Sequence, residues 1–252
     1  MLLKGVKTRV IRPKDNIVDI ILESLNSCGL TIEENDILVV SSKVVAVCEG
    51  RIVSLRDVKP SGKAVKLAEK CELPPEFVEV VLQEADVVYG GVKGAILTLK
   101  NGVLQANAGV DRSNAPPGCA ILLPEDPSRS AREIREKIFN KTGKKIGVLI
   151  VDSRVQPLRL GNVGVALGVA GFEPVIDERG KKDIYGWELK FTRRGVADCL
   201  ASAAEILMGE GREMVPIVLV RGAPVIYTDR NVDAAEMVIP SDECMYMGVM
   251  RH

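Results

Sequence analysis

Histidine and paired cysteines, which many enzyme sites require, are nearly missing from this chain of 252 residues. Its only histidine is His252, so no internal imidazole is available for a Ser-His or Cys-His catalytic pair, or for a zinc site built on histidine. The six cysteines include no CxxC pair. A metal ion bound here must therefore have oxygen ligands, which favours Mg²⁺ or Mn²⁺ over zinc.

Net charge and long apolar runs are also absent. Lys plus Arg and Asp plus Glu both number 34, so no overall basic field would attract nucleic acid. No run of 18 apolar residues occurs, and Lys4, Lys7 and Arg9 interrupt the apolar core that a signal peptide needs. We expect a soluble cytoplasmic protein with no membrane partner, whose cysteines are mostly buried free thiols.

Helical and extended patterns alternate along the chain, without an internal repeat or a low-complexity linker. Apolar spacing predicts helices over 15–26, 126–140 and 196–208, and apolar runs predict buried strands over 36–42, 146–151 and 216–220. Extended chain is expected over 44–48 and a strand over 188–192. The Asn101-Gly102 dipeptide predicts a hairpin between 95–99 and 103–106. The pattern indicates a mixed α/β fold, with residues 1–252 as a single unit of one large domain or two lobes.

A lone acid follows the apolar run at 146–151. We expect the strand to end at Asp152 and a polar loop to follow. Glycines beyond that acid would let backbone approach a ligand closely. The alternative is an ordinary polar loop after a buried strand. The polar residues of this segment are Ser153, Arg154, Gln156, Arg159 and Asn162, and its glycines are Gly161, Gly164, Gly168 and Gly171.

A second acid, Asp111, has similar surroundings in the segment NAGVDRSN at 107–114. It has hydroxyl and amide neighbours in Ser113 and Asn114, although Asp and Asn are also common turn formers. If folding brings the two acids together, their carboxylates could hold one or two divalent ions that bridge phosphate oxygens. Basic residues would neutralise the remaining charge, which is the equipment of phosphoryl transfer. These basic residues are Lys43, Arg154 and Arg159.

Common nucleotide-binding signatures do not occur. Ser61-Gly62-Lys63 lacks the upstream glycine and the following hydroxyl residue of a Walker A motif, and no GxGxxG is present. The glycine-rich segment 209–214, between a predicted helix and a predicted strand, could present backbone N–H groups to a nucleotide or could simply end the helix.

Several ordered motifs make the chain similar to the coenzyme F420-0:L-glutamate ligases over about residues 5–225. They include VVSSKVV, NAGVDRSN, LLPEDP, TGKKIGVLIVDS, RLGNVGVALGVAGF, DIYGWEL and LMGEG. The resemblance implies a two-lobed fold, a homodimer, and addition of L-glutamate to a deazaflavin precursor through a γ-linked amide. It also implies GTP as phosphoryl donor, with ATP as an alternative, Mg²⁺ or Mn²⁺ as cofactor, and a monovalent cation such as K⁺.

The same resemblance assigns roles to residues of this chain. It makes Asp111 and Asp152 catalytic metal ligands, joined by Ser153. From their charge beside these acids, we also expect Arg154 and Arg159 to bind substrate. An acyl phosphate would form on the acceptor carboxylate, and the glutamate amine would attack it. The implied nucleotide-binding residues are Thr8, Arg9, Val10, Ile11, Ser42, Lys43, Asn114, Met208, Gly209, Glu210, Gly211, Arg212, Glu213, Met214 and Val215.

The chain departs from the family pattern at three places. Val47 and Cys48 stand where the family commonly has a lysine before EGR, residues 154–158 differ beside the metal site, and Arg212 and Met214 replace small residues. Three alternatives therefore stay open. The chain could be a glutamate ligase for another acceptor such as a folate, a catalytically silent nucleotide-binding relative, or an α/β protein whose Asp segments are only turns.

Overall fold

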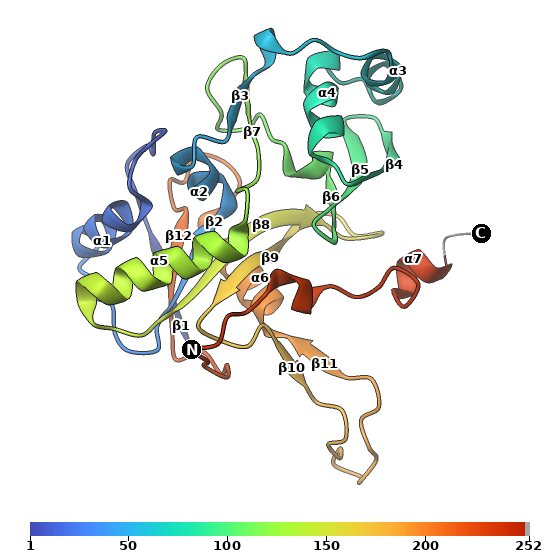
Figure 1. The fold of residues 1–252 in the computed structure, drawn as a ribbon. Helices are drawn as coiled ribbons and strands as arrows, with labels where there is room; N and C mark the ends of the chain where they lie inside the picture. Colours follow the sequence, from blue (N-terminus) through green and yellow to red (C-terminus); the bar gives the residue numbers. More distant parts are fainter. Residues whose placement is uncertain (250–252) are drawn as a thin grey trace.

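The computed structural model describes residues 1–249 (Figure 1). Its main sheet has five strands in the order β1-β12-β2-β8-β9, and only β2 and β8 are parallel neighbours. The mixed α/β class predicted from the sequence is confirmed, while the division into two lobes stays a prediction. The strand bounds are β1 Leu2–Val6, β12 Ile217–Arg221, β2 Ile37–Ser41, β8 Gly147–Val155 and β9 Asn162–Ala170.

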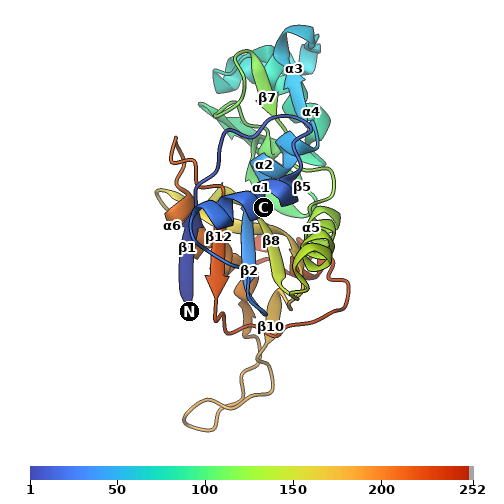
Figure 2. The same ribbon diagram turned by 90° about the vertical axis from the view of Figure 1, so that its left-hand side faces the viewer.

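Helices cover both faces of this sheet, which is why its central strands are uninterrupted apolar runs. α1 (Ile17–Ser27) and α5 (Pro127–Thr142) pack on the face formed by Leu38, Val40, Val148 and Ile150. α6 (Val196–Met208) packs on the opposite face, and Figures 1 and 2 show the sheet between these helices. The three long helices predicted from apolar spacing are confirmed.

The ends of α5 follow the capping signals in the sequence. The Asp126 side chain accepts a hydrogen bond from the Arg129 N–H at 2.9 Å, and Pro127 occupies the first turn, where its missing N–H costs nothing. Gly143 ends the helix with a φ of 68°, a left-handed conformation that suits glycine. α1 begins one residue later than expected. Asn16 caps it, while Asp15 pairs with Arg9.

Two glycines in β9 let helices approach the sheet. A Cβ on Gly164 would lie 2.4 Å from the carbonyl carbon of Ala201 in α6, and one on Gly168 would lie 2.3 Å from that of Pro127 in α5. The expectation that these glycines leave room for a ligand is therefore wrong, because helix backbone occupies the space. The expected polar loop is shorter than predicted and covers only residues 156–161, because β8 continues to Val155 and β9, which pairs with it, begins at Asn162.

A smaller part of the chain, residues 52–121, has its own core around Phe77, Val78 and Ile96. The predicted hairpin is confirmed as β5 and β6, and its turn residues Asn101 and Gly102 both have positive φ, at 50° and 76°. The elements of this part are β3 Ile52–Ser54, η1 Leu55–Asp57, α3 Gly62–Cys71, α4 Pro75–Glu84, β4 Val87–Val92, β5 Ala95–Lys100, β6 Val103–Ala106, η2 Asn107–Gly109 and β7 Cys119–Ile121.

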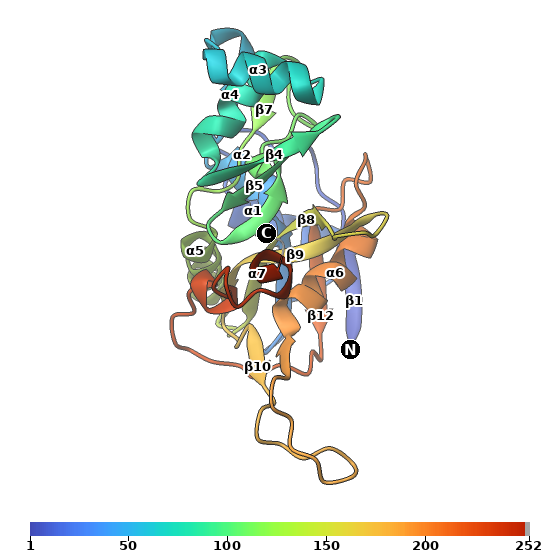
Figure 3. The same ribbon diagram turned by 90° about the vertical axis from the view of Figure 1, so that its right-hand side faces the viewer.

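Other predictions are wrong. Residues 44–48 are not extended but belong to α2 (Ser42–Cys48), and the strand expected at 188–192 lies at β11 (Arg193–Gly195) instead. Only Cys71 of the six cysteines is fully buried, although all six are free. β11 pairs with β10 (Val175–Asp177) at the base of a long hairpin that projects from the body in Figure 3.

The C-terminal segment ends the described chain with two short helices, η3 (Ala234–Met237) and α7 (Met245–Val249). Three methionines lie close together near the end of the sequence, Met245, Met247 and Met250, and the last of them lies outside the described residues. Within residues 1–249, none of the helices combines the length and the apolar character needed to cross a membrane.

Candidate active site

Asp152 lies inside β8, which continues to Val155 because it keeps pairing with β9. The predicted end of the strand at Asp152 is therefore wrong, and this acid is a strand residue. Since side chains alternate along a strand, Asp152 faces the same side of the sheet as Ile150. β2 runs parallel to β8 with Ser41 opposite Val151, so α2, which begins at Ser42, starts beside Asp152.

Asp111 reaches the same region from the smaller part of the chain. Its backbone exchanges two hydrogen bonds with Ile121, at 2.9 and 2.8 Å, which fixes its position. Its carboxylate accepts a hydrogen bond from Lys43 Nζ at 2.6 Å, from Ser113 Oγ at 2.5 Å and from the Ser113 N–H at 2.8 Å. Ser42 and Lys43 are the first two residues of α2, and they lie beside Asp152 and Asp111, respectively.

The surroundings move the pKa values of the two carboxyl groups in opposite directions. Burial raises the pKa of Asp111, but the hydrogen bonds from Lys43 and Ser113 outweigh it and hold the pKa below its usual value. Burial raises the pKa of Asp152 to about 6, and the Asp111 charge adds to this rise. The Ser153 N–H, the Lys43 charge and the Ser42 hydroxyl oppose it only in part. Pairs of acids with separated pKa values are typical of functional sites.

A pocket of about 170 Å³ contains both acids. The structure thus brings together residues that the sequence could only propose as neighbours, since Asp111 and Asp152 are 41 positions apart. Arg159, expected to bind substrate, is exposed and does not line this pocket. Predicted site residues along its wall are Ser42, Lys43, Asp111, Asp152, Ser153 and Arg154.

Two buried donors in this pocket lack partners among the described residues. The side-chain nitrogen of Gln105 and Nε of Arg154 are buried from solvent and donate to no protein atom, and Gln105 is only 4% exposed. An unpaired buried donor costs free energy on the order of 1–3 kcal/mol, so both positions suit an oxygen-bearing ligand. Sequence reasoning missed Gln105. The signal was a long polar side chain in an otherwise apolar hairpin strand, VLQA.

The predicted nucleotide-binding segments lie next to one another. The Thr8 N–H donates to the Met214 carbonyl at 2.9 Å, and the Asn114 side chain donates to the Gly211 carbonyl at 3.1 Å. Residues 8–11, Asn114 and 208–215 therefore meet beside the pocket. Some of their polar groups are engaged internally, because Arg9 pairs with Asp15 and the Gly211 N–H donates to the Glu213 carboxylate.

Two further acids, Glu205 and Glu210, lie close to each other, and Glu205 is near enough to Asp152 to be affected by its charge. Burial raises the pKa of Glu205 to about 7, with contributions from a hydrogen bond to Glu210, from the Glu210 charge and from Asp152. Glu210 also accepts from the side chain of Asn162, which lines the pocket, at 3.3 Å. Because like charges raise one another's pKa, a cation bound near Asp152 would make ionisation of these carboxyl groups less costly.

The donor set suits a hard metal ion in part. Carboxylate oxygens of Asp111 and Asp152 with the Ser153 hydroxyl are ligands that Mg²⁺ and Mn²⁺ accept, and Mg²⁺ usually completes its shell with water and substrate phosphates. Among the described side chains, no three or more Asp, Glu, His or Cys residues form a complete metal-binding group. Substrate oxygens would therefore have to complete the site.

Comparison with known proteins places the whole region in one family. The family described as F420-0:Gamma-glutamyl ligase matches residues 5–222. The Methanopyrus kandleri protein named "Coenzyme F420:L-glutamate ligase" is 45% identical over 215 residues, which cover 85% of this chain and 83% of that protein. Proteins with the same name from Methanothermobacter thermautotrophicus and Archaeoglobus fulgidus are 40% and 41% identical, over 83% and 81% of this chain and 84% and 82% of theirs. The chain belongs to the F420-0:Gamma-glutamyl ligase family.

Proposed function

We propose that this protein is a coenzyme F420:L-glutamate ligase, which forms a γ-linked amide between L-glutamate and a deazaflavin acceptor and draws its energy from GTP. The observation that carries the proposal is the pair Asp111 and Asp152 around Lys43 in one pocket, within the part of the chain that matches the family. The named relatives support the acceptor and the amino acid.

The proposed reaction has two steps. An oxygen of the acceptor carboxylate attacks the γ-phosphorus of GTP, and the bond from that phosphorus to the GDP oxygen breaks, giving an acyl phosphate. The amine of glutamate then attacks the acyl carbon, phosphate leaves with the bonding electrons, and the nitrogen loses a proton. Residues 8–11, Ser42, Lys43, Asn114 and 208–215 are proposed to hold the nucleotide.

In this scheme, side chains of the protein provide or hold the positive charges that offset the negative charge of the phosphates. Asp111, Asp152 and Ser153 would hold Mg²⁺ or Mn²⁺, which when bound offsets the negative charge of the phosphates. Lys43 Nζ, already 2.6 Å from Asp111, is proposed to add a fixed positive charge beside the transferred group. The unpaired donors of Gln105 and Arg154 are proposed to bind the acceptor carboxylate or phosphate oxygens.

The assembly proposed for the active protein is a cytoplasmic homodimer, with K⁺ as a further bound cation. The projecting hairpin supports association, because Ile184, Tyr185, Trp187 and Phe191 leave a cluster of large apolar side chains exposed on it.

Release of phosphate and GDP in the presence of Mn²⁺, L-glutamate and coenzyme F420-0 tests the proposal. We expect turnover that requires glutamate, is slower with ATP, and falls at least about 100-fold in Asp152→Asn. Turnover with a folate acceptor but not with F420-0 would assign the chain to another acceptor. Nucleotide binding without glutamate-dependent turnover on either acceptor would show a catalytically silent relative.

A further inference from the structure

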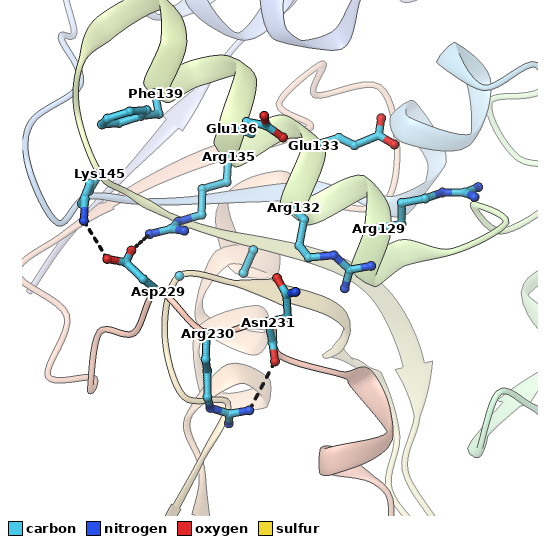
Figure 4. A pocket seen from close by; sticks show the side chains of 12 residues that line it. Arg129, Arg132, Glu133, Arg135, Glu136, Phe139, Lys145, Asp229, Arg230 and Asn231 are labelled. Carbon is cyan, nitrogen blue, oxygen red and sulfur yellow. Dashed lines mark hydrogen bonds and ion pairs between the residues drawn. The ribbon is translucent and has the colours of Figure 1, made fainter.

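A second pocket of the described chain, larger than that of the two acids, lies apart from the candidate active site. Its volume is about 470 Å³, and it lies between α5 and the segment Asp229, Arg230 and Asn231, with Ala170 and Gly171 beneath (Figure 4). It shares no lining residue with the pocket of Asp111 and Asp152. Ala170 pairs with Val148, four positions before Asp152 in β8, which corresponds to roughly 13 Å along a strand.

The wall of this pocket is rich in cations. α5 contributes three arginines at a spacing of three, which places them along one side of the helix. A charged helix side is usually solvated, yet Arg135 is partly buried and donates to the Ile146 carbonyl at 2.8 Å. The cations of the wall are Arg129, Arg132, Arg135, Lys145 and Arg230.

Four of these cations are already paired within the protein. Arg135 and Lys145 both hold Asp229 at 2.6 Å, and Arg129 pairs with Glu125 at 3.3 Å. Arg230 pairs with two further carboxylates, Glu173 and Glu236. These ion pairs involve every cation of the pocket wall except Arg132.

Arg132 is the cation without a partner. Its side chain is partly buried, and no hydrogen bond or ion pair joins it to any residue of 1–249. Figure 4 shows the Arg132 side chain on the side of α5 that faces Asn231, whereas Glu133 and Glu136, which also line the pocket, extend from other sides of the helix. A guanidinium that presents a planar fork of donors in a concave site is suited to an oxyanion.

We propose that this second pocket binds a small organic anion through a carboxylate or phosphate group held by Arg132, with Asn231 donating a further hydrogen bond. The volume exceeds what an inorganic ion needs and is in the range of small-molecule sites. Phe139 at the rim offers an apolar contact for the carbon skeleton of the ligand. The proposal does not depend on the ligase reaction, because the two pockets have separate walls.

Isothermal titration of the full chain without nucleotide tests this site, with glutarate and glycerol 3-phosphate as separate probes. We expect saturable binding of at least one probe, and the probe that binds identifies the oxyanion as carboxylate or phosphate. Arg132→Gln should weaken this binding at least about tenfold, since a lost charge-assisted pair is worth about 1.5–3 kcal/mol. Arg132→Lys, which keeps the charge but loses the fork, should weaken it several-fold.

Two controls separate this site from its alternatives. Lys141→Gln removes one positive charge from α5 outside the pocket wall, where Lys141 pairs with Asp19, and should leave binding unchanged. Asp152→Asn should also leave anion binding at the second pocket unchanged. The proposal for this pocket would therefore stand even if the ligase proposal failed. Three results would overturn the proposal. They are absence of saturable binding, unweakened binding by an Arg132→Gln protein that thermal unfolding shows to be folded, and a loss of binding in Lys141→Gln as large as that in Arg132→Gln.

Discussion

Lys43 affects the ionisation of both acids in the candidate site. Its ammonium pairs with Asp111 at 2.6 Å and also contacts the carbonyl and hydroxyl of Ser113, and its charge lowers the pKa of Asp152. One side chain thus sets the electrostatics of both acids. Sequence reasoning proposed these three residues as neighbours but could not supply their contacts, because they come from three separate elements.

Removal of this lysine should therefore disable the site. We predict that Lys43→Ala lowers kcat/KM at least about 100-fold, because a fixed charge beside the transferred group is lost. Lys63→Ala, at an exposed position of α3, is the matched control and should keep full activity. Steady-state kinetics with GTP and glutamate provide the comparison, and equal activity of the two variants would remove Lys43 from the mechanism.

Asp152 gives the protein a pH dependence whose sign follows from its raised pKa. In the folded state this carboxyl titrates at about 6, above the value of 3.8 that applies without the surrounding structure. The folded state therefore holds its proton more tightly, so the stability contribution present below pH 4 is lost as the pH rises to about 6. At pH 7 the ionised group is a net cost to the fold.

Asp152→Asn should accordingly stabilise the metal-free protein at pH 7 while it abolishes activity. We expect a gain in unfolding free energy of roughly 1–3 kcal/mol at pH 7 and none at pH 4. Urea unfolding of the variant and the original protein at both pH values, without divalent ions, measures this difference in unfolding free energy. A loss of stability at pH 7 would mean that the ionised carboxylate is well compensated, contrary to the raised pKa.

At the scale of elements, the central sheet and its helices follow from sequence signals, whereas the site's local structure does not. Apolar runs predicted three of the strands, and apolar spacing with helix-end signals predicted three of the helices. These elements are β2, β8, β12, α1, α5 and α6. α2 was missed because its valines favour strands, while packing of Val45 and Ala46 against the sheet and Ile121 made the segment helical. The extension of β8 past Asp152 depends on its pairing with β9, which is a tertiary contact.

The glycines of β9 provide a prediction at this scale. Gly164→Ala and Gly168→Ala should each destabilise the protein by more than about 2 kcal/mol, because the added methyl group meets helix backbone that cannot move aside without repacking. Gly62→Ala is the control, since its Cβ would meet nothing within 4 Å and alanine suits the first turn of α3. Urea unfolding of the three variants measures their free energies of unfolding. An unchanged value for Gly164→Ala would show that α6 is packed loosely against β9.

At the scale of the whole molecule, the hairpin beyond β10 and β11 is the feature least expected from the sequence. Tryptophan is usually found in the core, but Trp187 is 75% exposed, and its apolar neighbours on the hairpin are exposed as well. Residue types alone could not reveal this, because exposure depends on where the hairpin projects. An exposed apolar arm in a protein proposed to be a dimer is a candidate contact surface.

Trp187 is the only tryptophan, so its fluorescence reports on this arm directly. We predict that the emission maximum shifts to shorter wavelength as protein concentration rises, because association would shield the indole from water. Sedimentation velocity should show that Tyr185→Ser favours the monomer, whereas Val92→Ser, at an exposed apolar position elsewhere, should not. Emission that stays constant while the protein dimerises would place the interface away from the hairpin.

Whether Asp111 and Asp152 hold the same divalent ion is the question on which the ligase proposal depends most. Titration of the protein with Mn²⁺ in the presence of GDP, followed by electron paramagnetic resonance, measures bound and free ion directly. We predict that Asp111→Asn and Asp152→Asn each weaken Mn²⁺ binding at least about tenfold, and that Asp57→Asn, at an exposed site in η1, leaves it unchanged. Unchanged Mn²⁺ affinity in both active-site variants would contradict the shared metal site.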